Sequence, residues 1–262
     1  MEPYTRNGSI IGKVMDFGAT DQYVIGETTG PATIELVATT GRVSSQPASS
    51  TLTLPSGLEP GDLVIVATAS DGGVPSYPSG YTSGQQLSSS VDGMWAYKFM
   101  SDPVDTVVSG LDSSTTDTHI AIAFRGVDQS NPLDVSSPSL NTGGSGSPNP
   151  PAITTSTNGA VVVALGFLDD DQIASSLGPP SGYTFAAASD SSSRGATMMS
   201  AYKTVTTAGT EDPGTFNTSS DDWGAATLAL RPGTAPIPIY GNKKNSGIWD
   251  LQSVLEYRSQ AI

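Results

Sequence analysis

The chain has 262 residues, which is enough for one large domain or two small ones. It carries 11 Lys and Arg against 25 Asp and Glu, and a formal net charge of -14 argues against nucleic-acid binding along the phosphate backbone as the main activity. The absence of cysteine excludes disulfides, thiol catalysis and thiolate metal sites. Gly and Pro number 29 and 19, while charged residues make up only 14%, a composition that favours short strands and turns. We therefore expect an all-β protein.

The first predicted part of the chain is an N-terminal arm, residues 1–50, that serves as an attachment segment. Neither this arm nor the rest of the chain contains an apolar run as long as a membrane span, and the arm lacks the apolar stretch of a signal peptide. We expect no membrane insertion and no export directed by the chain itself.

An internal duplication organises residues 51–233. Four short motifs occur twice in the same order: Gly61–Ala67 with Gly159–Ala164, Pro78–Thr82 with Pro180–Thr184, Ala96–Lys98 with Ala201–Lys203, and Ala121–Gly126 with Thr227–Pro232. The spacing between the copies grows slowly from 98 to 106 residues, as loop insertions between equivalent strands would produce. The two halves are 51–127 and 152–233.

Each half is predicted to contain six short strands separated by turns. The ranges are 51–54, 62–70, 81–88, 94–100, 104–109 and 118–125 in the first half, and 152–155, 160–168, 183–189, 196–205, 214–217 and 223–230 in the second. Thr118–Arg125 alternates large and small residues, as in a strand with one core-facing side. The unbroken apolar run Leu63–Val66 indicates a strand covered on both faces.

These patterns predict a two-sheet antiparallel β-sandwich, jelly-roll-like, with extended terminal arms. The twelve strands are compatible with one large sandwich or with two small sandwiches in tandem. We favour the single sandwich, because the linker at 128–151 is long enough to cross a sheet edge.

The last predicted part is a C-terminal arm, residues 234–262. Pro236–Ile239 is typical of an extended spacer, because each proline fixes its own φ and disfavours helix at the preceding residue. Beyond it, a short amphipathic helix is predicted. Its apolar residues are candidates for anchoring a partner or for packing back onto the sandwich: Ile248, Trp249, Leu251 and Leu255.

The repeated motifs resemble a duplicated β-sandwich module of tailed-bacteriophage virion proteins. The resemblance rests on the order Pro78–Thr82, Tyr97–Lys98 and Ala123–Asp128, repeated and closed by Leu228–Pro232. Two end motifs, Asn7–Lys13 and Gly247–Gln252, are similar to terminal segments of virion structural proteins of marine phages, including tail-fibre-like ones. The resemblance covers about 180 residues and implies a virion component, without placing it on the head or the tail.

The best candidate metal site is an acidic turn, Asp169, Asp170 and Asp171, with Asp71 at the equivalent turn of the first half. Calcium takes several oxygen ligands of this kind, but the spacing is not that of an EF-hand, and a solvated turn is the favoured interpretation. No other cofactor is expected.

Two tryptophans, Trp223 and Trp95, are candidate sugar-stacking residues, although a core position is the more common role for either ring. The single histidine, His119, is interpreted as structural. The cations at matching positions of the two halves, Lys98 with Lys203 and Arg125 with Arg231, are expected to pair with nearby acids, and Tyr81 and Tyr183 to seal equivalent corners.

The sequence therefore predicts a non-enzymatic structural protein on the exterior of a phage particle, either a tail fibre or tail-associated adhesin or a head decoration protein. It would be anchored through its ends to other virion proteins and would form a homo-oligomer. The alternative is a carbohydrate-binding module that attaches to host surface glycans. A depolymerase that uses paired carboxylates is the least favoured interpretation.

Overall fold

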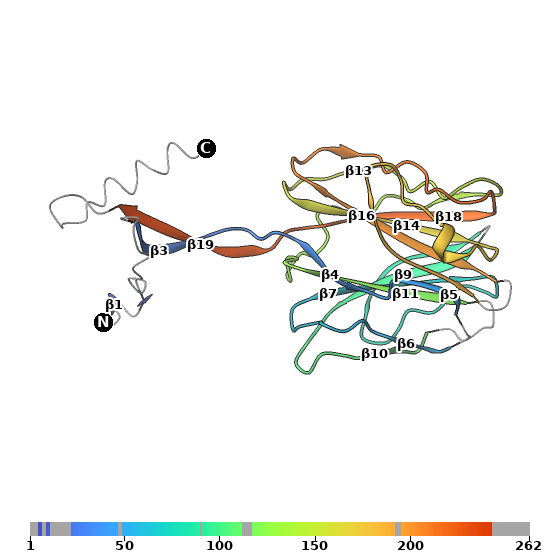
Figure 1. Ribbon diagram of the computed structural model, residues 1–262, viewed down its shortest axis with the longest axis horizontal. Coiled ribbons are helices and arrows are strands. Elements are labelled where there is room, and N and C mark those ends of the chain that lie inside the picture. Colours follow the sequence, from blue (N-terminus) through green and yellow to red (C-terminus); the bar gives the residue numbers. More distant parts are fainter. Residues whose placement is uncertain are drawn as a thin grey trace. The chain divides into compact units, whose positions relative to one another are not determined.

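The structure is a computed structural model that describes residues 5–6, 9–10, 22–46, 49–89, 91–111, 117–191 and 195–242 (Figure 1). The chain divides into two compact units. Unit 1 comprises residues 1–31 and 234–262, and unit 2 comprises residues 32–233. Apart from one short 3-10 helix, η1 (Ala174–Ser176), the described elements are strands, so the all-β prediction is confirmed. No described helix has the length and apolarity needed to cross a membrane.

The described residues of unit 1 form two antiparallel strand pairs. Strands β1 (Thr5–Arg6) and β2 (Ser9–Ile10) form the short pair. The long pair joins β3 (Gln22–Pro31) to β19 (Thr234–Asn242), so segments from the two ends of the sequence form one ribbon. The predicted spacer Pro236–Ile239 is extended, as expected, but it is paired along its length with β3.

The first sheet of unit 2 has five strands in the order β4-β11-β7-β9-β8. All neighbouring strands are antiparallel. Their bounds are β4 Glu35–Thr39, β7 Leu63–Ser70, β8 Thr82–Ser88, β9 Asp92–Phe99 and β11 Thr118–Arg125.

The second sheet has six strands in the order β12-β18-β14-β16-β15-β5. They are antiparallel except for β5, which pairs in parallel with β15. Their bounds are β5 Arg42–Gln46, β12 Asn141–Gly143, β14 Ala160–Leu168, β15 Thr184–Ser191, β16 Thr197–Val205 and β18 Trp223–Leu230.

The two sheets share one pairing scheme. The order β11-β7-β9-β8 in the first sheet matches β18-β14-β16-β15 in the second. Registers match as well: Val64 lies opposite Lys98, and Val162 lies opposite Lys203. Each half also has a small two-stranded sheet, β6 (Thr51–Thr53) with β10 (Val107–Ser109) in the first half and β13 (Ile153–Thr154) with β17 (Thr210–Glu211) in the second.

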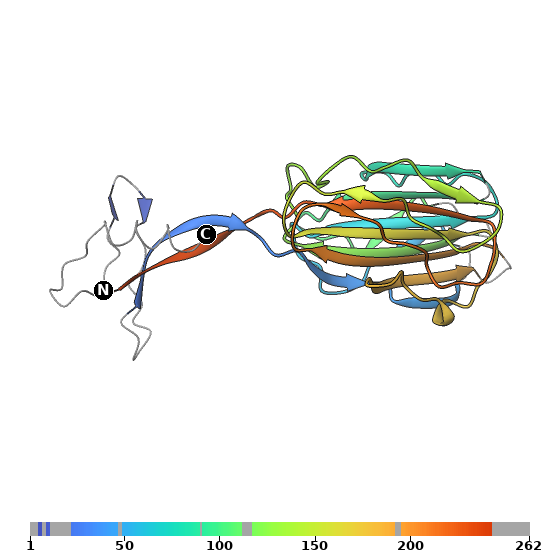
Figure 2. The ribbon, with the colours of Figure 1, turned by 90° about the horizontal axis from the view of Figure 1, so that it is seen from above.

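A central apolar cluster takes side chains from both large sheets. The first sheet contributes Ile65, Trp95 and Phe124, and the second contributes Val163 and Phe167. Figures 1 and 2 show the strands of the two sheets as adjacent layers. Burying this many apolar side chains between the sheets provides the main driving force for bringing the two halves together.

Close approach of the sheets depends on two glycines. A Cβ atom at Gly93 of β9 would lie 2.7 Å from Phe167 Cδ1 of the second sheet. A Cβ atom at Gly224 of β18 would lie 2.2 Å from Leu87 Cδ2 of the first sheet. Each sheet therefore inserts a large side chain over a glycine of the other, an arrangement that any larger residue would disturb.

Two further apolar clusters lie on the outer faces of the sheets. One packs Leu52 and Val108 of the small sheet β6-β10 against Val64 of β7, and the other packs Ile153 and Phe216 against the second sheet. The inner strands are thus covered on both faces, which explains why Leu63–Val66 is an unbroken apolar run.

The described strands follow the predicted ranges in most places. In unit 2 the exceptions are β17, which lies at 210–211 rather than at 214–217, and three edge strands that the sequence did not predict, β4, β5 and β12; strands β1, β2 and β3 of unit 1 were not predicted either. Strands β4 and β5 fall within the predicted N-terminal arm but pair with β11 and β15, and residues 32–50 belong to unit 2. The predicted C-terminal helix lies outside the described residues.

Candidate functional site

One end of unit 2 gathers acidic side chains from both halves. Asp169 follows β14, Asp221 precedes β18, and Asp71 follows β7 of the first sheet. Because β7 and β14 are equivalent strands, Asp71 and Asp169 occupy equivalent turns. The packing of the sheets brings these two turns close enough for their charges to interact.

The pKa of Asp169 is raised to about 6. Partial burial is the largest cause, followed by repulsion from Asp71, Asp221, Asp170 and Asp222. Burial also raises the pKa of Asp221, although backbone N–H groups of Asp222 and Asp170 donate to its carboxylate and oppose the shift.

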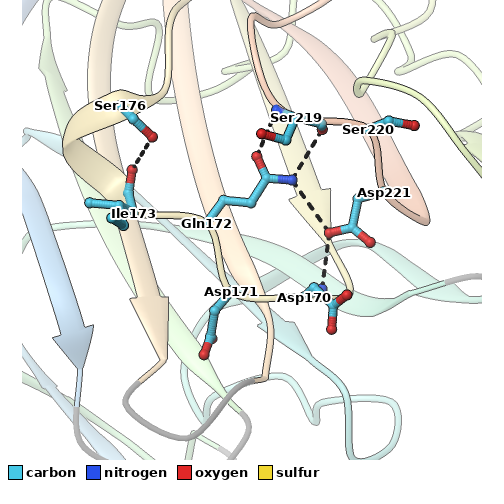
Figure 3. A pocket seen from close by; sticks show the side chains of 8 residues that line it. All are labelled: Asp170, Asp171, Gln172, Ile173, Ser176, Ser219, Ser220 and Asp221. Atoms are coloured by element: carbon cyan, nitrogen blue, oxygen red, sulfur yellow. Dashed lines mark hydrogen bonds between the residues drawn. The ribbon is translucent and has the colours of Figure 1, made fainter.

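A cavity of about 380 Å³ lies beside this cluster, between the loop that follows β14 and the loop that precedes β18 (Figure 3). The Gln172 side chain bridges the two loops: its Oε1 accepts from Ser219 N at 2.9 Å, and its Nε2 donates to Ser219 O at 3.1 Å. Asp170 N donates to Asp221 Oδ2 at 3.2 Å. The remaining lining is polar apart from Ile173, whose side chain is 65% exposed.

The predicted calcium ligands are not directed toward a common point. Asp171 Oδ1 accepts from Ser191 Oγ and Gly195 N, both at 2.9 Å, and Figure 3 shows Asp171 directed away from Gln172 and Asp221. Among the described residues, no group of three or more His, Cys, Asp or Glu is arranged to hold a metal ion. Calcium binding at Asp169, Asp170 and Asp171 stays a prediction.

The two candidate sugar-stacking tryptophans have different environments. Trp95 is 1% exposed and belongs to the central cluster, with its ring over Gly84, where a Cβ atom would lie 2.3 Å from Cδ2. The proposed glycan contact at Trp95 is therefore wrong, because the ring has no face open to a ligand. Trp223 is partly exposed, packs over Gly143, and lies two residues after Asp221 of the cavity.

The matched cations pair with acids, as the sequence predicts. Lys98 Nζ lies 2.5 Å from Asp105 Oδ2, and Lys203 Nζ lies 2.7 Å from Glu211 Oε1. The Arg125 guanidinium binds the buried Asp62 carboxylate through two hydrogen bonds of 2.8 and 2.9 Å.

Arg231 pairs with a different acid, Asp134 of the linker, at 3.5 Å. Burial would raise the pKa of Asp134, but hydrogen bonds from Thr157 and Ser156 outweigh it and lower that pKa.

Each lysine also lies over a tyrosine ring of the repeated Pro-Ser-Gly-Tyr-Thr turn. Lys98 Nζ is 5.8 Å from the centre of the Tyr81 ring, and Lys203 Nζ is 5.7 Å from the centre of the Tyr183 ring. Burial and the adjacent acid, Asp105 or Glu211, raise the pKa of each phenol. The hydroxyls differ: Tyr183 Oη donates to Glu211 Oε1 at 3.3 Å, whereas Tyr81 Oη has no hydrogen-bond partner among the described residues.

His119 is buried at 1% exposure between two polar groups. Its Nε2 lies 3.0 Å from Ser49 O, so it donates there, and its Nδ1 lies 2.9 Å from Thr68 Oγ1. These bonds fit the structural role predicted for it.

The predicted anchoring residues, Ile248, Trp249, Leu251 and Leu255, lie outside the described residues. The cavity lining was only partly predicted. The sequence singled out Asp170 and Asp171 of the acidic turn, but nothing in it connects Gln172 with Ser219, because the contact joins two loops 47 residues apart.

Comparison of the chain with protein-family models, curated proteins and solved structures finds no match.

Asp169 is predicted to lower stability at neutral pH. Because its pKa is about 6 in the folded chain and 3.8 in the reference state, its contribution to stability is full below pH 4 and is lost as the pH rises through 6. Asp169→Asn should therefore raise the free energy of unfolding at pH 7.5 by about 1 kcal/mol after allowance for solvent screening, and the gain should vanish near pH 4.

Urea unfolding at the two pH values measures this effect, and Asp71→Asn provides the matched variant. The gain from Asp169→Asn should be smaller in the Asp71→Asn background, because part of the repulsion is already gone. An equal gain in both backgrounds would contradict the proximity of the two turns.

The two tyrosine turns provide a matched pair of substitutions. Tyr183→Phe removes the hydrogen bond to Glu211 and should lower the free energy of unfolding by about 0.5–1.5 kcal/mol. Tyr81→Phe removes a buried hydroxyl without a described partner and should be neutral or slightly stabilising. Equilibrium unfolding of both variants measures the difference, and equal losses would show that the Tyr81 hydroxyl is bonded.

Proposed function

We propose that this chain is a non-enzymatic structural protein on the exterior of a tailed-bacteriophage particle, where unit 1 attaches it and unit 2 is displayed. The observation that carries the proposal is the proximity of the two ends of unit 2. Ala32 N donates to Gly233 O at 2.8 Å, so the first and last residues of unit 2 lie next to each other in space. The segments that continue from these residues, β3 and β19, belong to the same unit.

The closeness of the two ends of unit 2 is suited to displaying this unit on a particle surface. A compact unit whose two ends leave it together can be presented by an anchor without distortion of its core, as tolerated domain insertions also demonstrate. It agrees with the expectation that both arms serve attachment.

We further propose that unit 2 is a duplicated β-sandwich, in which each half has its own outer apolar cluster and the two halves share a central one. Three kinds of observation support a duplication: the common strand order, the matched registers, and the repeated Lys-over-Tyr contacts. Each half has its own outer cluster, and the central cluster joins the halves. In this proposal, each half forms a small sandwich of one large and one small sheet, and the two large sheets pack together, so the two alternatives that the sequence left open are combined.

A structural role is favoured over catalysis by the contacts of the matched cations and of the single histidine in unit 2. The matched cations Lys98, Lys203, Arg125 and Arg231 are paired with acids, and His119 is buried with both ring nitrogens hydrogen-bonded. Catalytic acids and bases need access to a substrate, which the buried His119 lacks.

Immunogold electron microscopy of phage particles from the source of this sequence tests the proposal. Antibodies raised against unit 2 provide the label, and preimmune serum is the control. We expect label on the outer surface of intact particles, on the tail for a fibre or adhesin and on the head for a decoration protein. Particles without label, with the protein confined to the host-cell fraction, would contradict the proposal.

A second candidate is the carbohydrate-binding module, and one observation favours it: Trp223 is partly exposed and follows Asp221 of the polar cavity by two residues. A sugar would use the ring for stacking and the polar groups for its hydroxyls. On a glycan array, this candidate predicts binding that Trp223→Ala weakens more than tenfold, and an array without hits rejects it.

A further inference from the structure

The ribbon formed by β3 and β19 in unit 1 has one blocked edge and one open edge. In an antiparallel pair, residues alternate between hydrogen-bonded positions, whose N–H and C=O groups face the partner strand, and non-hydrogen-bonded positions, whose groups face outward. The bond from Ala32 N to Gly233 O fixes the phase of this alternation. Counting along the register, the pairs Thr29 with Pro236 and Glu27 with Pro238 are non-hydrogen-bonded.

The two prolines of β19 fit this alternation of hydrogen-bonded and non-hydrogen-bonded positions. A proline has no N–H, so it fits a strand only where the N–H would face outward. Pro236 and Pro238 both occupy outward positions of β19, and they leave its free edge with few donors. On β3, the outward backbone groups of Thr29 and Glu27 are intact, and no other described strand pairs with them.

We propose that the open edge of β3 pairs with β3 of a second copy of this chain, which creates a four-stranded sheet across a twofold axis. The proposal deepens the proposed attachment function and rests on it. A two-stranded ribbon is marginally stable in water, and added strands at an open edge stabilise it. Antiparallel pairing of two β3 strands satisfies the unpaired backbone N–H and C=O groups of both copies at once. Each copy then uses the same surface, as in an isologous dimer.

The register of this pairing follows from the outward positions. Centred on Thr28, it makes Glu27 and Thr29 of one copy hydrogen-bonded partners of Thr29 and Glu27 of the second, with four backbone hydrogen bonds. It also avoids placing two glutamates directly opposite each other.

The charge distribution favours a second copy as the occupant. Residues 1–31 and 234–262 hold six Asp or Glu and five Lys or Arg, whereas residues 32–233 hold 19 and six. Copies of unit 2 repel one another, while copies of unit 1 are nearly neutral and can associate.

A cysteine cross-link in the full-length chain tests the pairing directly, because the native sequence has no cysteine. In the proposed register, Thr28 faces Thr28 of the second copy in a non-hydrogen-bonded pair, where Cα atoms are about 4.5 Å apart and a disulfide can form. Thr28→Cys should form a covalent dimer of twice 26.8 kDa under mild oxidation. Thr29→Cys, the matched control, should cross-link at least fivefold less.

Proline substitutions test the same edge without a cross-link. Thr29→Pro blocks the open edge of β3 and keeps the bonds to β19, so sedimentation should show a dimer for the wild type and a monomer for this variant. Thr234→Pro adds a proline to an outward position of β19 and should leave the dimer intact.

A monomeric wild type, or equal cross-linking at both cysteine positions, would overturn the proposal. A monomer that is still found on labelled particles would refute the dimer and leave the proposed function standing. A dimeric wild type that is absent from particles would support the dimer and refute the proposed function. Loss from particles on Thr29→Pro with a monomeric wild type would assign the edge to another virion protein and so refute the second copy as the occupant.

Discussion

Burial of apolar side chains between the two large sheets is the interaction on which the rest of unit 2 depends. Residues such as Ile65 and Phe124 on one sheet meet Val163 and Phe167 on the other, and this contact converts two similar halves into one body. The fit is sensitive to shape, because Phe167 and Leu87 each lie over a glycine of the opposite sheet. A buried hydrogen bond of 2.6 Å from Thr118 to Ser189 joins the sheets at another point of the interface.

The same packing positions the candidate site. Asp71 and Asp169 end equivalent strands in different halves, and only stacking of the sheets brings their charges into range. The cavity beside them depends on local bonds instead, because Gln172 joins two loops of the second half through the backbone of Ser219. The acidic end of unit 2 thus combines an interaction between halves with a pocket that one half forms alone.

Much of the fold could be predicted because its inner strands carry strong local patterns. Runs such as Leu63–Val66 and the alternation in Thr118–Arg125 indicate buried strands, and the repeated turns predict a duplication. The edge strands β4, β5 and β12 could not be predicted, because half-exposed edges lack such a pattern and form through pairing with β11, β15 and β18. Trp95 was misjudged for a related reason: the space for its ring is provided by Gly84 on a neighbouring strand, which composition does not reveal.

The central claim, that the two halves fold as one body through the central cluster, is tested most directly by unfolding with two local probes. Trp95 reports on the first half and Trp223 on the second, so each can be the sole tryptophan in a chain in which the other and Trp249 are replaced by phenylalanine. We predict urea transitions with the same midpoint and the same slope for both probes. Two separate transitions would show that the halves are independent and would contradict this account.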